Sequence, residues 1–171
     1  MKKYYVAVYD SGTVCWFKDA KYTIPHREDG PAVEYVNGAK KWYINGRFHR
    51  EGGPAVEWAD GTKVWCIDGK YHREDGPAIE NAKGVKEWWI NNRRHREDGP
   101  AIEYADGTKK WYVNGKRHRE DGPAVEFANG DKRWYINDDR LTEEQFFART
   151  AEELTIAQIE QMLNKRIKVV K

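Results

Sequence analysis

The segment His95-Arg-Glu-Asp-Gly-Pro-Ala-Ile-Glu-Tyr-Ala-Asp-Gly-Thr-Lys-Lys-Trp-Tyr-Val-Asn-Gly-Lys-Arg117 is one copy of a 23-residue unit that occurs five times in tandem. Each copy begins with histidine and reaches Gly-Pro-Ala four residues later; the five copies begin at His26, His49, His72, His95 and His118. A fixed period of this length is the signature of a repeat architecture, in which each unit buries its apolar surface against its neighbours. Residues 26–140 are therefore predicted to form five stacked repeats.

An incomplete copy precedes the five full ones. Val6–Tyr22 aligns without a gap to Ala32–Phe48. The matched positions include Tyr9 with Tyr35, Gly12 with Gly38 and Trp16 with Trp42. We therefore predict one repeat array over residues 1–140, in which residues 1–25 form a partial repeat and residues 26–140 the five full repeats.

Two turn dipeptides divide each unit into strand-sized segments. In the fourth copy they are Asp106-Gly107 and Asn114-Gly115. Asn-Gly and Asp-Gly are the strongest short hairpin signals, because both central residues of the favoured two-residue turn need a positive φ. The predicted fold is mostly β: an elongated antiparallel meander of tandem β-hairpin repeats in a single twisted sheet, with about 10 Å of length per repeat.

The expected register of the first hairpin divides the side chains between the two faces of the sheet. With a two-residue loop, Ile102 lies opposite Trp111 and Tyr104 lies opposite Lys109. The predicted buried face then carries a stripe of tryptophan and β-branched side chains. The other face is predicted to be solvated and to carry Glu103, Lys110 and Tyr112, with the equivalents of Tyr112 in the other copies, which are Tyr43, Cys66, Trp89 and Tyr135.

The pattern changes after Arg140, and residues 141–171 are predicted to form a helical C-terminal cap. Thr142 with Gln145 forms a capping box, and Leu141 with Phe146 forms a hydrophobic staple. The same device recurs from Leu154, so two helices are expected, over about 143–149 and 156–165, followed by a tail over 166–171 that could add a strand. Their expected role is to cover the open sheet edge left by the last repeat.

The bulk composition excludes several classes of protein. The chain of 171 residues has 30 basic and 28 acidic residues, and this balance argues against a dedicated nucleic-acid or membrane-surface protein. It has neither a secretory signal nor a run of about 20 apolar residues, so we expect a soluble cytoplasmic protein. Cys15 and Cys66 show no metal-binding spacing, and free thiols are favoured over a disulfide.

The repeated His-Arg-Glu-Asp sequence brings an imidazole and two carboxylates close together, which invites a catalytic or metal-binding hypothesis. Catalytic sites are usually single, whereas this cluster recurs about every 10 Å, too far apart for neighbouring histidines to share an ion. We therefore expect the arginine to pair with a carboxylate and Gly-Pro to fix the turn. No catalytic residue, metal ligand or cofactor is predicted. The rows of Glu34 and Lys40 equivalents are interpreted as solvated ladders rather than as a charged binding track.

Residues that break the repeat pattern on the predicted exposed face are the best candidates for a specific contact, because folding alone does not require them. Trp89 and Glu87 are such departures, and the centre of the array is irregular at Gly52 and Asn81 as well. The candidate partner-binding residues are Tyr43, Trp58, Glu87, Trp89, Arg93, Arg94, Lys110, Tyr112, Arg133 and Tyr135. Rings beside cations can also hold single-stranded nucleic acid or a nucleotide, but alternating glutamates are expected to cancel the basic field.

The unit length, together with Tyr104-Ala-Asp-Gly107 and Asn114-Gly-Lys-Arg-His118, resembles the MORN repeat, a 23-residue β-hairpin module. The resemblance covers residues 6–140. The chain departs from the family pattern at His118-Arg119, where the family has His-Gly, and at Lys110, which replaces a glycine. It is therefore similar to a divergent branch that includes bacterial YwqK-like antitoxins and repeat proteins of phages and large DNA viruses. Lipid binding is not carried over.

The resemblance implies a non-enzymatic scaffold that binds a macromolecular partner, most plausibly a protein. A phage or bacterial inhibitor fits it, either anti-defence or antitoxin-like, which acts by occupying its target in the cytoplasm, the host cytoplasm if the chain is phage-encoded. The alternative is a ligand-sequestering or nucleic-acid-binding protein that uses the aromatic face. Open sheet edges would also allow a homodimer.

Overall fold

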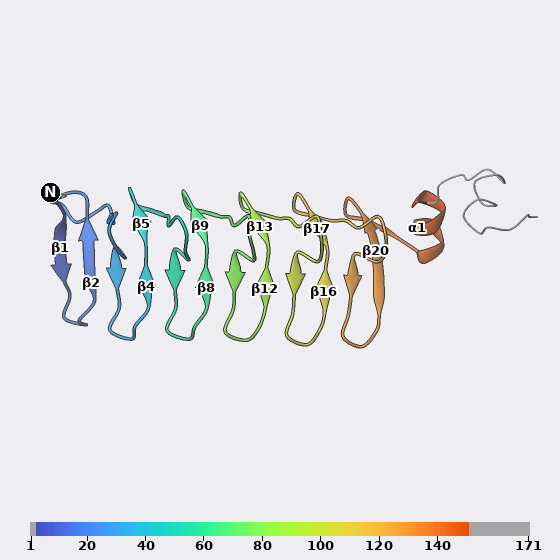
Figure 1. Ribbon diagram of the computed structural model, residues 1–171, viewed down its shortest axis with the longest axis horizontal. Coiled ribbons are helices and arrows are strands. Elements are labelled where there is room, and N and C mark those ends of the chain that lie inside the picture. The colour runs from blue at the N-terminus through green and yellow to red at the C-terminus, as the bar shows by residue number, and fades with distance from the viewer. Residues whose placement is uncertain (1–2, 151–171) are drawn as a thin grey trace, which may run out of the picture.

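A computed structural model describes residues 3–150 of the chain, and its architecture is mostly β (Figure 1). Thirteen short strands form one long, open antiparallel sheet, in the order β1-β2-β3-β4-β7-β8-β11-β12-β15-β16-β19-β20-β21. Because every pair is antiparallel and the strands follow in chain order, the sheet is a meander. One helix follows the last strand. The predicted fold class is confirmed.

The strands are short, and most have two residues. The main sheet consists of β1 (Tyr5–Val8), β2 (Val14–Phe17), β3 (Val33–Glu34), β4 (Lys40–Lys41), β7 (Val56–Glu57), β8 (Lys63–Val64), β11 (Ile79–Glu80), β12 (Lys86–Glu87), β15 (Ile102–Glu103), β16 (Lys109–Lys110), β19 (Val125–Glu126), β20 (Lys132–Ile136) and β21 (Asp139–Leu141). Four two-stranded ribbons lie along one end of these strands (Figure 1). They are β5 (Tyr43–Ile44) with β6 (Arg47–Phe48), β9 (Cys66–Ile67) with β10 (Lys70–Tyr71), β13 (Trp89–Ile90) with β14 (Arg93–Arg94), and β17 (Tyr112–Val113) with β18 (Lys116–Arg117).

The ribbons arise because the chain leaves the main sheet after the tryptophan of each full repeat but the last. The Trp42 N–H still donates to the Ala55 carbonyl of the next repeat, at 2.8 Å. The next residues pair instead across the second turn, with Tyr43 opposite Phe48. In the last repeat β21 takes the place of a further repeat, and β20 runs unbroken through Trp134. The predicted long sheet is thus present, and the four ribbons are added to it.

The second turn has the predicted geometry. Val113 lies opposite Lys116, which leaves a two-residue loop. Asn114 and Gly115 have φ values of 52° and 86°, so both central residues are left-handed, as a type I′ turn requires. Asn91-Asn92 and Asn137-Asp138 adopt the same conformation, which asparagine and aspartate tolerate.

The first turn differs from the prediction by one residue. The Tyr104 N–H donates to the Thr108 carbonyl at 2.9 Å, so the loop has three residues, not two. Of the three, Gly107 alone has a positive φ, 91°, as in a type I turn followed by a G1 bulge. The strands therefore pair with Ile102 opposite Lys110 and not opposite Trp111.

A one-residue shift in register moves the second strand's side chains to the other face. Lys110 and Tyr112 therefore share a face with Ile102, and their predicted place beside Glu103 was wrong. The prediction that Cys66 and Tyr135 are solvated was also wrong, because their exposed fractions are 2% and 4%. We call this side the ring face; it carries the β-branched Val33, Val56, Ile79, Ile102 and Val125 with the rings Tyr35, Tyr43, Trp58, Trp89, Tyr104, Tyr112, Phe127 and Tyr135.

The opposite side, which we call the arginine face, carries the tryptophans that were predicted to lie beside the β-branched residues. These are Trp16, Trp42, Trp65, Trp88 and Trp111, each covered by Arg27, Arg50, Arg73, Arg96 or Arg119, respectively. The row of glutamates from Glu34 to Glu126 lies on the same face. Each of these glutamates stands opposite a lysine across the strand pair, as Glu103 stands opposite Lys109.

Helix α1 (Glu143–Thr150) begins with the predicted capping box. The Thr142 N–H donates to Gln145 Oε1 at 2.9 Å, and the Gln145 N–H donates to Thr142 Oγ1 at 3.1 Å. Phe146 is 1% exposed, and the helix contacts β20 and β21 at the end of the sheet (Figure 1). The predicted second helix and tail strand lie outside the described residues. Within residues 3–150, no helix has the length and apolar character needed to cross a bilayer.

Candidate binding surface and the repeated arginine motif

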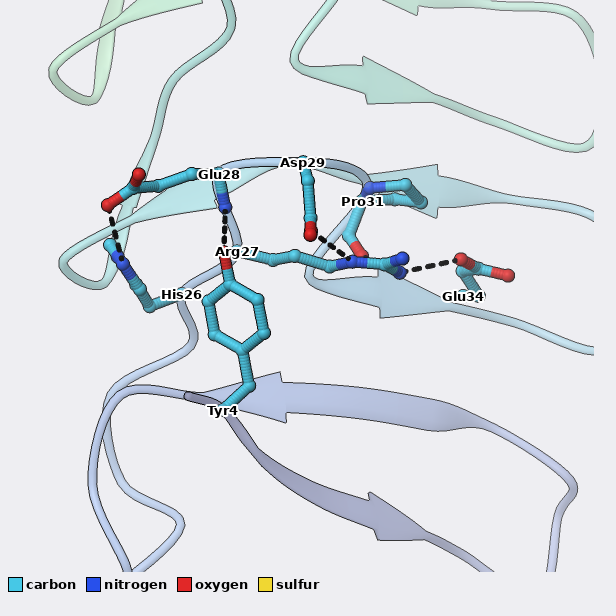
Figure 2. Close-up of polar contacts among 7 residues, drawn as sticks. All are labelled: Tyr4, His26, Arg27, Glu28, Asp29, Pro31 and Glu34. Carbon is cyan, nitrogen blue, oxygen red and sulfur yellow. Dashed lines mark hydrogen bonds and ion pairs between the residues drawn. The ribbon is translucent and has the colours of Figure 1, made fainter. Parts of the chain in front are cut away.

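Each repeat holds one arginine against a tryptophan, a proline carbonyl and a glutamate, and in every copy except the second, where Gly52 replaces the aspartate, the arginine also contacts an aspartate. Figure 2 shows the first copy. Arg27 Nε donates to Asp29 Oδ1 at 2.9 Å, and its Nη1 donates to Glu34 Oε1 at 3.3 Å and to the Pro31 carbonyl at 3.2 Å. The guanidinium carbon lies 4.1 Å from the centre of the Trp16 ring. A planar guanidinium suits this arrangement, because it stacks on a ring while its edges donate to oxygens.

The glycine of Gly-Pro-Ala explains why the arginine lies so flat. A Cβ atom at Gly30 would stand 2.9 Å from Arg27 Cζ, closer than real Cβ contacts allow. The corresponding distances at Gly53, Gly76, Gly99 and Gly122 are 3.0, 2.9, 2.9 and 3.1 Å. The glycine therefore leaves room for the guanidinium, and none of the five has a positive φ.

The histidine at the start of a repeat contacts the second turn of the same unit. The Asn45 N–H donates to His26 Nδ1 at 3.0 Å, and His26 Nε2 lies 3.5 Å from Glu28 Oε1. Nδ1 must be unprotonated to accept that hydrogen bond, so the proton of the neutral ring is on Nε2. The Asn114 N–H makes the same contact with His95. In the irregular central turn this bond is missing: His72 Nδ1 is buried and has no hydrogen-bond partner among the described residues.

The charged groups of the arginine motif are largely satisfied by one another. The pairing of arginine with carboxylates that the sequence predicted is present in all five copies. Hydrogen bonds from Arg73, Arg96 and Arg119 lower the pKa values of Asp75, Asp98 and Asp121. Across residues 3–150, no cluster of three or more His, Cys, Asp or Glu side chains is arranged to hold a metal ion. The motif thus has the geometry of a structural clasp.

The ring face also has cations over aromatic rings, and here they include lysines as well as arginines. Lys41 Nζ is 4.7 Å from the centre of the Trp58 ring, and Arg94 Cζ is 4.6 Å from that of Trp89. Lys110, Arg117 and Arg133 lie 4.8, 4.0 and 4.8 Å from the rings of Tyr104, Tyr135 and Phe127, respectively. Tryptophan, tyrosine and arginine are the residues enriched in the energetic centres of protein interfaces.

Acidic side chains are scarce on the ring face. Among the described strands of the main sheet, its carboxylate is Glu87, which accepts hydrogen bonds from Arg94 Nε at 3.1 Å and from Trp89 Nε1 at 3.2 Å. The periodic glutamates lie on the arginine face, so they do not alternate with the ring-face cations as the sequence suggested. The two faces therefore differ in charge.

Most of the predicted binding residues meet on the ring face. Tyr43, Trp58, Glu87, Trp89, Arg94, Lys110, Tyr112, Arg133 and Tyr135 all lie there. Arg93 lies on the other side of its ribbon, opposite Ile90, whereas Arg94 lies opposite Trp89. Tyr135 is buried and therefore supports the surface from below.

A hollow of about 470 Å³ opens at the centre of the ring face. It is lined by Phe48, Val56, Trp58, Val64, Cys66, Gly69, Tyr71, Trp89 and Asn92. The hollow forms where Cys66 occupies the position that holds a ring in the other full repeats. Cys66 and Cys15 are buried free thiols, and burial raises the pKa of the Cys66 thiol to about 11.

Sequence reasoning missed the hollow because it treated Cys66 as one more member of a solvated row. The sequence shows that a ring is missing at that position. Whether the missing ring leaves a hollow depends on which face of the sheet the other rings fill, and the sequence placed them on the wrong face. The predicted set also omitted Phe48 and Tyr71, which follow the second turn. Phe48 stacks on Tyr43 at a centroid distance of 4.4 Å, and Tyr71 is tilted against Trp89 at 5.4 Å.

The tandem β-hairpin architecture, with its ion pairs repeating every 23 residues, is established by the structure. No protein-family model matches the chain, and no curated protein matches it. The geometry of the ring face, with its hollow, its rings and its cations, therefore carries the functional argument.

Proposed function

We propose that this chain is a MORN-like repeat scaffold that binds a protein partner through its ring face. One observation carries the proposal: tryptophan, tyrosine and phenylalanine side chains line a hollow on one face of a sheet that has no second layer among the described residues. Tryptophan and tyrosine are enriched in interface hot spots, which cluster in well-packed pockets.

The size of the ring face supports a protein partner. At about 10 Å per repeat the array extends over roughly 50 Å. A standard protein interface needs about 800 Å² from each partner, which a strip of that length can supply. Trp58 and Tyr71 are 46% and 40% exposed, so large apolar side chains are available at its centre.

The proposed mode of action is occupation of a target without catalysis. The titratable groups of the arginine motif are engaged in internal ion pairs, which leaves them to stabilise the fold. Following the family resemblance, we propose a phage or bacterial inhibitor, anti-defence or antitoxin-like, that works in the cytoplasm.

A second function, binding of single-stranded nucleic acid or a nucleotide, is favoured by the cations that lie over the ring-face aromatics. Such proteins combine a basic groove with stacking rings. The net charge of +2 is small for a polyanion-binding protein. We therefore rank this alternative second.

The test uses neighbouring residues that lie on opposite faces. Lys110→Gln with Arg133→Gln removes two cations from the ring face, and Lys109→Gln with Lys132→Gln removes two from the arginine face. Affinity purification from the native host with mass spectrometry should recover a partner with the wild type and with the Lys109/Lys132 variant, and recover much less with the Lys110/Arg133 variant. Equal recovery by both variants would contradict the proposal. So would tight oligonucleotide binding that weakens steeply with salt, which would establish the second function.

A further inference from the structure

The hollow at Cys66 is a vacancy in an otherwise continuous row of rings. Tyr43 stands at the equivalent position one repeat earlier, and Trp89 stands there one repeat later. Tyr43 stacks on Phe48, whereas Cys66 lies opposite Tyr71, which turns to Trp89 instead. The small side chain therefore leaves space for a ring that the chain itself does not supply.

A second substitution keeps the hollow open. Trp58 precedes the first turn of its repeat, and the equivalent residue of the next repeat is Asn81, a small polar side chain in place of a ring. The volume of about 470 Å³ lies near the lower end of the range for small-molecule pockets, about 300–1,000 Å³. The hollow has apolar and aromatic walls. Its size suits one large side chain better than an extended ligand.

The charges along the ring face select the kind of segment that would carry such a side chain. Glu87 is already engaged by Arg94 and Trp89. Lys110, Arg133 and Arg140 lie on the ring face towards the C-terminal end, and none of them has an ion-pair partner within the described part of the chain. In the order of the sheet, Lys110, Arg133 and Arg140 lie four, six and seven strands from β8. A segment that starts in the hollow and runs along the ring face would therefore reach uncompensated positive charge about 20–35 Å away, and carboxylates there would be attracted.

We infer that the hollow receives one aromatic or large aliphatic anchor side chain from an acidic segment of a protein partner, whose carboxylates face Lys110, Arg133 and Arg140. This inference rests on the proposed function and names the partner's chemistry. The anchor would replace the missing ring and complete the row, and the buried apolar contact would supply most of the affinity. The carboxylates would add specificity and speed of association.

The decisive variant is Cys66→Tyr, which restores the ring that most other repeats carry and fills the hollow without departing from the repeat pattern. Because Tyr43, Tyr112 and Tyr135 already occupy this position, the variant should fold at least as stably as the wild type. Cys66→Ala, which keeps the hollow open, is the matched control. Circular dichroism and urea unfolding establish that both variants are folded.

The probe is a display library of short linear peptides, selected on the full wild-type chain. We expect the selected peptides to share one aromatic or large aliphatic residue and, about six to ten residues away in an extended chain, Asp or Glu. They should bind Cys66→Ala like the wild type and lose about tenfold or more in affinity for Cys66→Tyr. The Lys110→Gln/Arg133→Gln variant should weaken binding and reduce its dependence on salt.

Two outcomes would overturn the inference: selected peptides without an anchor residue, or equal affinity for Cys66→Tyr and the wild type. Its failure is distinguishable from failure of the proposed function. If the host partner is lost with Lys110→Gln/Arg133→Gln but retained with Cys66→Tyr, the ring face binds the partner and the hollow does not. If neither variant changes recovery of the partner, both proposals fail.

Discussion

Arg96 shows how one side chain organises a repeat. Its guanidinium lies 4.0 Å from the centre of the Trp88 ring and donates to Asp98, to the Pro100 carbonyl and to Glu103. Exposed ion pairs contribute little individually, about 0–1 kcal/mol. The arrangement mainly fixes the position of the guanidinium, because stacking on the ring and close approach to glycine hold its N–H donors in place. The repeated His-Arg-Glu-Asp-Gly-Pro sequence therefore has a packing role in each unit.

Gly99→Ala tests this account, because φ at Gly99 is not positive and only the space is limiting. The new Cβ would lie 2.9 Å from Arg96 Cζ and displace the guanidinium from Trp88. We expect a loss of about 1–3 kcal/mol in the free energy of unfolding, as for other overpacked sites. Urea unfolding measures it.

The control is the same change in an Arg96→Ala background. Without the guanidinium there is nothing to displace, so Gly99→Ala should then cost much less, and the double-mutant cycle should show a coupling of about 1 kcal/mol or more. An unchanged cost would mean that the glycine acts through the backbone and not through the arginine.

At the scale of the hairpin, the sequence predicts the second turn correctly and the first turn incorrectly, and the two turn dipeptides explain the difference. Asn114-Gly115 determines its own turn, because few residues other than asparagine, aspartate and glycine tolerate two successive positive φ values. Asp106-Gly107 suits two turns: a two-residue type I′ loop and a three-residue loop in which only glycine has a positive φ. The dipeptide alone cannot choose between them, and the choice decides the face of Lys110, Tyr112 and Cys66. The fold class could therefore be predicted from the sequence, whereas the face on which these residues lie, and with it the hollow, could not.

Gly107→Ala isolates the conformational demand of the first turn. Gly107 has a φ of 91° and nothing lies within 4 Å of the position of a Cβ atom, so the cost is backbone strain alone. We expect a loss of about 1–2 kcal/mol, measured by urea or thermal unfolding. Gly107→Asn should lose less, because asparagine tolerates positive φ. Equal losses for the two variants would show that the strain is not what matters at this turn.

The whole molecule is an array in which each unit contacts mainly its neighbours. The unit at each end therefore lacks a neighbour on one side. At the N-terminal end β1 is the outermost strand, and Val6 and Val8 are 46% and 70% exposed. At the other end α1 follows β21 and contacts the last two strands. Unprotected sheet edges invite pairing with other chains. The helix is therefore expected to protect its edge of the array.

Phe146 and Phe147 allow a matched test of that role, since adjacent residues of α1 differ only in burial. Phe146 is 1% exposed and Phe147 is 57% exposed. Phe146→Asp places a charge where a ring was buried, at a local cost of about 3 kcal/mol or more, enough to detach a helix of this length. Limited proteolysis should then cut within 142–150, and size-exclusion chromatography should show self-association through the uncovered edge. Phe147→Asp introduces the same charge at the surface and should leave both measurements unchanged; the same behaviour from both variants would mean that burial of Phe146 does not hold the cap.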